Sequence, residues 1–166
     1  MSIHPANSKA DVIILGLGNT LLRDEGVGVH IVNRLSGEFK FSPEVPIIDG
    51  GTFGLDLLPY IENKEYVLLI DAVNFNKEPG FIGVIMKDKI LTQLNTILSV
   101  HHLGLADVLS AAKLLDKEPK NITLIGIQPL SIEAGLEMTD TVKNVIDEAI
   151  ERVIKQLDVW GVKVIG

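Results

Sequence analysis

Four apolar runs constrain the fold of this chain more than any other feature. They span Val12 to Leu15, Val45 to Ile48, Tyr66 to Ile70 and Ile122 to Ile127, and each ends at a glycine or a polar residue. The runs are continuous rather than alternating, which is typical of strands buried on both faces of a parallel sheet. We therefore expect these segments to be strands of one mostly parallel sheet.

Segments with helical spacing separate these runs. A helix is expected from about Glu25 to Leu35, with Asp24 as its N-cap. Further helices are expected around Leu57, from Leu105 to Ala112, and along an amphipathic C-terminal segment from Val142 to Leu157, with Thr139 or Asp140 as candidate caps. Residues 79–87 begin with a turn and predict an added antiparallel or edge strand, whereas residues 38–46 are expected to be a loop.

The alternation of strands and helices predicts the fold class. Right-handed crossovers place helices on both faces of the sheet, which gives an α/β three-layer sandwich with a mostly parallel twisted sheet of about five strands. The length of 166 residues and the 46% apolar content fit one domain over residues 1–166, with residues 1–10 as a polar N-terminal extension. Ligand sites in such folds form outside the carboxyl ends of the strands.

Charge and composition exclude several classes of function. The net charge of −7 disfavours nucleic acid, whose binding requires a concentrated basic surface. The chain has no cysteine, which excludes disulfides and thiolate metal sites and fits a reducing compartment. It shows no signal peptide and no apolar run long enough for a membrane span. We expect a soluble cytoplasmic protein.

The segment from Gly16 to Gly28, GLGNTLLRDEGVG, resembles a phosphate-binding turn but lacks its defining residues. Leu21 stands where a dinucleotide fingerprint needs its third glycine, and no Gly-Lys-Ser or Gly-Lys-Thr follows. Asp24 and Glu25 would repel phosphate at the helix terminus that should receive it. A carboxylate there suits a cation or a substrate amide, although spacing alone makes Glu25 an ordinary acid of a first helical turn.

Other acids and histidines follow the predicted strands. Asp49 and Asp71 directly follow the second and third runs, and His101 and His102 lie at the expected start of a helix. Successive helical residues point about 100° apart, so one metal ion does not readily bind both histidines. The remaining histidines, His4 and His30, receive a structural or surface interpretation. Together, Glu25, Asp71 and one of the paired histidines suit a divalent metal with one position left open.

Five motifs in a fixed order connect these residues to a known family. They are GLGNTLLRDEGVG, IDGGTFGLDLL, VLLIDAV, SVHHLGLADVLSA and GIQP, and they extend over nearly the whole chain. In this combination the chain resembles the endopeptidases that mature nickel-iron hydrogenases. Members remove a C-terminal extension from the precursor of the hydrogenase large subunit after nickel insertion, and they share the α/β sandwich expected above.

The resemblance implies a role for each candidate residue. Glu25, Asp71 and His101 match the family's metal-contacting glutamate, aspartate and histidine, and are the expected catalytic and metal-binding residues of a peptidase classed as aspartic-type. His101 is chosen by register, although Val100 and His102 replace the proline and glutamine of close relatives. Nickel is then supplied by the substrate, so the expected partner is the nickel-loaded precursor, bound by a monomer.

The IDGGT turn carries a second expectation about the substrate. Asp49, Gly50, Gly51 and Thr52 are expected to line the cleft, where backbone amides orient the extended tail. Whether the metal polarises the scissile carbonyl, or a carboxylate acts as general base, stays open at this point.

Two other functions remain as alternatives. Peptidyl-tRNA hydrolases also begin with a strand and G-L-G-N, but continue with P-G and a later H-N-x-G, whereas this chain has Thr20 and DEGVG. A nickel-binding chaperone that recognises the precursor without cutting it belongs to a different class. Tail release distinguishes an endopeptidase from that chaperone.

Overall fold

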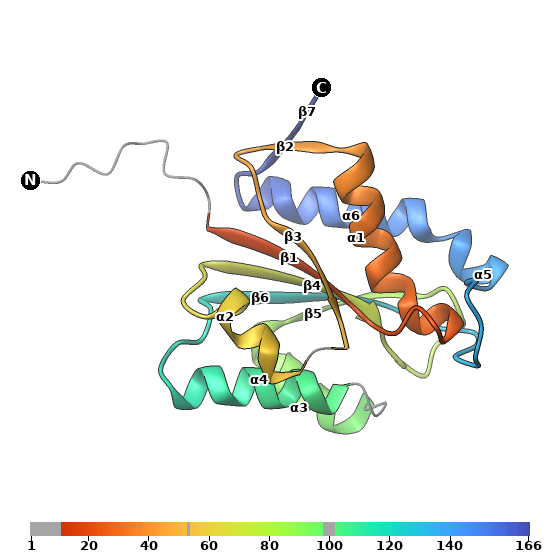
Figure 1. The fold of residues 1–166 in the computed structure, drawn as a ribbon, viewed down its shortest axis with the longest axis horizontal. Helices are drawn as coiled ribbons and strands as arrows, with labels where there is room; N and C mark the ends of the chain where they lie inside the picture. The colour runs from red at the N-terminus through yellow and green to blue at the C-terminus, as the bar shows by residue number, and fades with distance from the viewer. Residues whose placement is uncertain (1–10, 53, 98–101) are drawn as a thin grey trace, which may run out of the picture.

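The computed structural model describes residues 11–52, 54–97 and 102–166 (Figure 1). Its main sheet has five strands in the order β3-β1-β4-β6-β5. The parallel strands are β1 (Val12–Leu17), β3 (Ile47–Gly51), β4 (Tyr66–Ala72) and β6 (Asn121–Ile127), and β5 (Ile82–Met86) pairs antiparallel with β6 at one edge. The predicted α/β class, the mostly parallel sheet and the antiparallel edge strand are confirmed.

Helices cover both faces of this sheet. In Figure 1, α1 (Val27–Glu38) and α6 (Ile146–Val159) lie on one face, and α2 (Leu58–Ile61), α3 (Lys87–Ile97) and α4 (His102–Leu114) lie on the other. Each face has its own apolar cluster: Ile14 packs with α1 and α6, whereas Ile13 and Leu15 pack on the side of α4. This division explains the continuous apolar runs, because after its first residue each of β4 and β6 is buried throughout, as is all of β1.

Some elements differ from the expectation. The predicted C-terminal helix is two helices, α5 (Asp140–Lys143) and α6, and the apolar spacing did not reveal the break because both helices pack on the same cluster. The expected loop over residues 38–46 contains β2 (Lys40–Ser42), which pairs antiparallel with β7 (Lys163–Ile165). The second strand begins at Ile47 rather than Val45. Helix α3 was not predicted.

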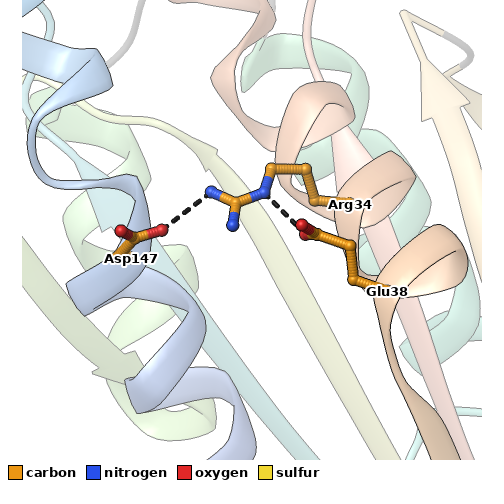
Figure 2. Close-up of polar contacts among 3 residues, drawn as sticks. All are labelled: Arg34, Glu38 and Asp147. Atoms are coloured by element: carbon orange, nitrogen blue, oxygen red, sulfur yellow. Dashed lines mark hydrogen bonds and ion pairs between the residues drawn. The ribbon is translucent and has the colours of Figure 1, made fainter.

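An exposed ion-pair cluster connects the two helices of one face. Arg34 of α1 donates a hydrogen bond from Nε to Glu38 at 2.7 Å and from Nη1 to Asp147 of α6 at 2.9 Å (Figure 2). The hydrogen bond to Glu38, followed by that to Asp147, raises the pKa of Arg34 above its ordinary value. Exposed pairs of this kind contribute little to stability, so the apolar contacts between α1 and α6 hold this layer.

Candidate active site

Close backbone packing fixes the segment between β1 and α1. Gly18 has a φ of +128°, and a Cβ at this position would lie 1.9 Å from the carbonyl oxygen of Glu25. A Cβ on Gly28 would lie 2.1 Å from the carbonyl oxygen of Ile70. Only glycine permits these approaches. They bring the start of α1 against the end of β4, where Asp71 follows Ile70.

Glu25 and Asp71 are both buried at this edge of the sheet. Glu25 lies in the short helix η1 (Arg23–Gly26), which contacts β4, and Asp71 lies in β4. Each side chain is only 2% exposed. The backbone N–H of Ala72 donates to Oδ1 of Asp71 at 2.8 Å. Since η1 contacts β4, and β4 lies beside β1 in the sheet, the two acids lie on neighbouring elements near the carboxyl ends of these strands.

The third member of the predicted metal trio, His101, lies outside the described residues. His102 is the first residue of α4, and Figure 1 shows α4 beginning on the side of the sheet where β1 and β4 end. Within residues 11–52, 54–97 and 102–166, no group of three histidine, aspartate or glutamate side chains is arranged to hold a metal ion. The described part of the site therefore consists of two buried carboxylates.

A hollow of about 620 Å³ opens at the segment between β1 and η1, and one of its lining residues, Gly18, packs against the backbone of Glu25. Three of the four predicted substrate-contacting residues, Asp49, Gly51 and Thr52, line it together with residues of the β1–η1 segment: Gly18, Asn19, Thr20 and Leu21, with Val29 of α1. The turn is held by a 2.9 Å hydrogen bond from the N–H of Gly51 to Oδ1 of Asp49. The fourth, Gly50, is buried against the side chains of Leu17 and Leu57 and does not line the hollow.

Asp24 has a different role from the predicted N-cap. The residue before α1 is Gly26, and no side chain caps that helix. The carboxylate of Asp24 is fully buried and accepts four hydrogen bonds from residues 130–139. The donors are the N–H groups of Leu130 (3.0 Å), Ser131 (3.1 Å) and Thr139 (2.7 Å), and the hydroxyl of Thr139 (2.8 Å). Asp24, which directly precedes Glu25, therefore binds a loop that is distant in the sequence.

The hydroxyl of Thr139 also accepts a hydrogen bond from the N–H of Val142, so the predicted cap at Thr139 is confirmed for α5. One side chain thus joins the helix start to Asp24. The start of α5 is therefore connected through Thr139 to the residue before Glu25.

Gln128 is a supporting residue that sequence reasoning did not assign. Its Oε1 accepts a 2.6 Å hydrogen bond from the N–H of Phe75, and its Nε2 donates to Oδ1 of Asn74 at 3.2 Å. These bonds hold the segment that follows Asp71. A polar residue directly after a buried strand, in the GIQP motif, was the available signal.

His30 lies away from the candidate site, on a separate surface of α1. It lines a hollow between α1 and the segment before α6, together with Met138 and Lys143. Burial lowers the pKa of His30 below its ordinary value, which favours the neutral imidazole. This position agrees with the structural interpretation of His30, whereas His4 lies outside the described residues.

The described helices include none that is both long and apolar enough to cross a membrane.

Sequence comparisons relate the chain to hydrogenase maturation proteins. The model of the hydrogenase maturation protease family matches residues 29–156, a segment that contains Asp71 and begins just after Glu25. The hydrogenase 2 maturation protease of Escherichia coli K12 is 37% identical over 155 residues, which are 93% of this chain and 94% of that protein. The hydrogenase expression/formation protein HupD of Rhodobacter capsulatus is 36% identical over 162 residues, covering 96% and 77% of the two chains.

Solved structures give the same relationship in three dimensions. The hydrogenase maturating endopeptidase HybD from E. coli superimposes with a TM-score of 0.88 at 37% identity, covering 93% of this chain and 96% of that one. The nickel-iron hydrogenase maturation protease HybD from Thermococcus kodakarensis gives 0.73 at 29% identity, covering 87% and 97%. The matched segment, the relatives and the shared fold agree, and the chain belongs to the hydrogenase maturation protease family.

Proposed function

We propose that this peptidase removes the C-terminal extension of a nickel-iron hydrogenase large-subunit precursor after nickel insertion, and that it recognises the nickel carried by that precursor. Glu25, Asp71 and His101 bind the nickel of the substrate in this proposal. The metal is part of the substrate rather than a resident cofactor, so cleavage follows only from a correctly loaded precursor.

The observation that carries this proposal is the presence of two buried carboxylates on elements in contact, Glu25 on η1 and Asp71 near the end of β4. Glu25 and Asp71 are each 2% exposed. Burying charged groups to this degree is costly unless they are paired, hydrogen-bonded or bound to a metal. Carboxylate oxygens with an imidazole nitrogen form a mixed donor set that suits a borderline divalent ion such as nickel. The family membership supports the same use of these acids.

The nickel requirement is tested by comparing two forms of one precursor. Nickel-loaded and nickel-free large subunit are mixed with the protein, and loss of the tail is followed by mass spectrometry. We expect tail release from the loaded form and none from the nickel-free form, because the metal supplies the contact that places the tail at the site. Equal cleavage of both forms would rule out recognition through nickel, and retained binding without tail release would indicate a chaperone.

We assign the hollow at the β1–η1 segment to the extended tail. It has one wall from the β1–η1 segment and another from the Asp49 turn, with both backbone and polar side chains facing it. Gly51 has a φ of +49°, a backbone conformation that residues other than glycine and asparagine rarely adopt. Because it is glycine, no side chain projects from this position of the wall.

Filling the hollow is expected to weaken binding of the tail. Thr52→Tyr should raise KM for tail release about tenfold, the equivalent of ~1.4 kcal/mol, because the larger side chain occupies the space of the tail. Gly51→Val should have a larger effect, since it also strains the turn. Gly37→Val is the matched control, because a Cβ there meets no atom within 4 Å. Steady-state kinetics of tail release measure these effects. An unchanged KM in both variants would show that the tail does not bind in this hollow.

We further propose that the protein acts in the cytoplasm as a monomer. The absence of cysteine fits a reducing compartment. Light scattering of the purified protein measures the oligomeric state, and a stable dimer would contradict the monomer.

A further inference from the structure

Four exposed aliphatic side chains lie on two segments beside the candidate site. Leu21 is 61% exposed, and in the loop from Gln128 to Thr139 the exposures are 56% for Leu130, 49% for Ile132 and 72% for Leu136. We call these four residues the apolar lip. Single exposed leucines are ordinary, but several on two joined segments form the kind of feature that marks an interaction surface.

Backbone hydrogen bonds join the two segments of the lip. The N–H of Gly135 donates to the carbonyl of Leu21 at 2.9 Å, and the N–H of Arg23 donates to the carbonyl of Gly135 at 3.0 Å. Arg23 also donates from Nε to the carbonyl of Glu137 at 3.0 Å. The N–H of Asp24 donates to the carbonyl of Ser131 at 3.1 Å. The loop is thus held along its length against the residues immediately before Glu25.

The lip is preorganised at some cost to the chain. Arg23 has a φ of +47°, in the left-handed region of backbone conformation that residues other than glycine, asparagine and aspartate rarely adopt. The carboxylate of Asp24 is fully buried, and the four hydrogen bonds described above all connect it to residues 130–139. A strained residue and a buried charge therefore hold aliphatic side chains in solvent. Such fixed apolar surface lowers the entropy that a partner must overcome on binding.

We propose that the apolar lip docks the folded body of the large-subunit precursor whose tail enters the hollow. This inference rests on the proposed function. Leu21 belongs to both surfaces, since it also lines the hollow, so a protein whose tail occupies the hollow must lie against the lip. Exposed Glu133 borders the lip, and the carboxylate of Glu137 pairs with Lys143 at 3.9 Å, so the apolar side chains rather than charge define the matching surface of the precursor.

The test separates docking from cleavage. The double variant Leu130→Ser/Leu136→Ser, called the lip variant, is compared with wild type. The control is Leu114→Ser, which removes an 87% exposed leucine at the far end of α4. The dissociation constant for the nickel-free precursor is measured by biolayer interferometry, and kcat and KM for the loaded precursor by tail release. We expect the lip variant to raise both the dissociation constant and KM about tenfold with kcat within about twofold, because truncating central apolar contacts costs about 1 kcal/mol or more.

Each alternative gives a different result. Unchanged constants in the lip variant, or an equal rise in Leu114→Ser, would overturn the docking role. Light scattering that shows a wild-type dimer converted to a monomer by the lip substitutions would assign the lip to a second copy of this chain instead. If wild type releases no tail from the loaded precursor, the proposed function fails, and the dissociation constants still decide the docking role. Urea midpoints within error of wild type establish that the substitutions leave the fold intact.

Discussion

Replacing Glu25 with glutamine is expected to lower the rate of tail release by about 10²- to 10⁴-fold, the range typical of losing a catalytic acid or base. Glutamine has nearly the same shape as glutamate, so the change removes a charge without opening a cavity. Because Glu25 is 2% exposed, solvent does not replace the lost charge. The proposed nickel contact would then lack one of its anionic donors.

Asp71→Asn is expected to give a loss of similar size, since Asp71 is buried to the same extent at the end of the neighbouring strand. Residues that act together are not additive, so the double variant should be little worse than either single variant. His101→Ala should join this group, whereas His102→Ala should be milder. The reverse ranking of the two histidines would assign the ligand to His102.

The measurement is single-turnover release of the tail from nickel-loaded precursor, followed by mass spectrometry. Glu151→Gln on α6 is the matched control, because its carboxylate is exposed on a helix that covers one face of the sheet. Circular dichroism and urea midpoints should show the same fold in every variant. A folded Glu25→Gln protein with wild-type cleavage would remove Glu25 from the mechanism.

The sheet could be predicted from sequence because its signal is local. The central strands are buried on both faces, so Val12 to Leu15 and Val67 to Ile70 are buried and apolar throughout. The family resemblance gave the same fold. The pairing of β2 with β7 had no such signal, since each has only three residues and they are more than 100 positions apart along the chain.

The site could be predicted in part. The two acids were recognisable in the sequence, and the structure packs η1, which carries Glu25, against β4, which carries Asp71. The role of Asp24 could not be predicted, because its hydrogen-bond donors lie 106 to 115 residues away. Helix-start statistics favour an acid near this position as a cap, but tertiary contacts with the loop determine what the side chain binds.

Family membership also decides between the functions that the sequence left open. The chain matches proteases that mature hydrogenases over most of its length, in sequence and in structure. This result favours an endopeptidase over a chaperone or a peptidyl-tRNA hydrolase. The buried carboxylates are consistent with that choice, because an acidic site suits a cation better than a phosphate backbone.

Asp24→Ala is expected to lower the free energy of unfolding by about 3–5 kcal/mol, because the substitution leaves several buried donors of the 130–139 loop without an acceptor. Asp24→Asn keeps the shape but turns an amide N–H₂ toward N–H donors, so it should also destabilise, by about 1–3 kcal/mol. Thr139→Ala removes one hydroxyl donor and the cap of α5 and should cost about 1 kcal/mol.

Urea unfolding followed by fluorescence of Trp160, the single tryptophan of the chain, measures these losses. Trp160 stacks on Tyr66 with ring centroids 4.7 Å apart, so its signal reports on the packed core. Asp107→Ala, at an exposed position of α4, is the control and should change stability by no more than about 0.5 kcal/mol. A double-mutant cycle should give a coupling of about 0.5–3 kcal/mol between Asp24 and Thr139. If the losses of stability from the two single substitutions simply add, the Asp24–Thr139 contact does not hold the 130–139 loop against the residues before Glu25.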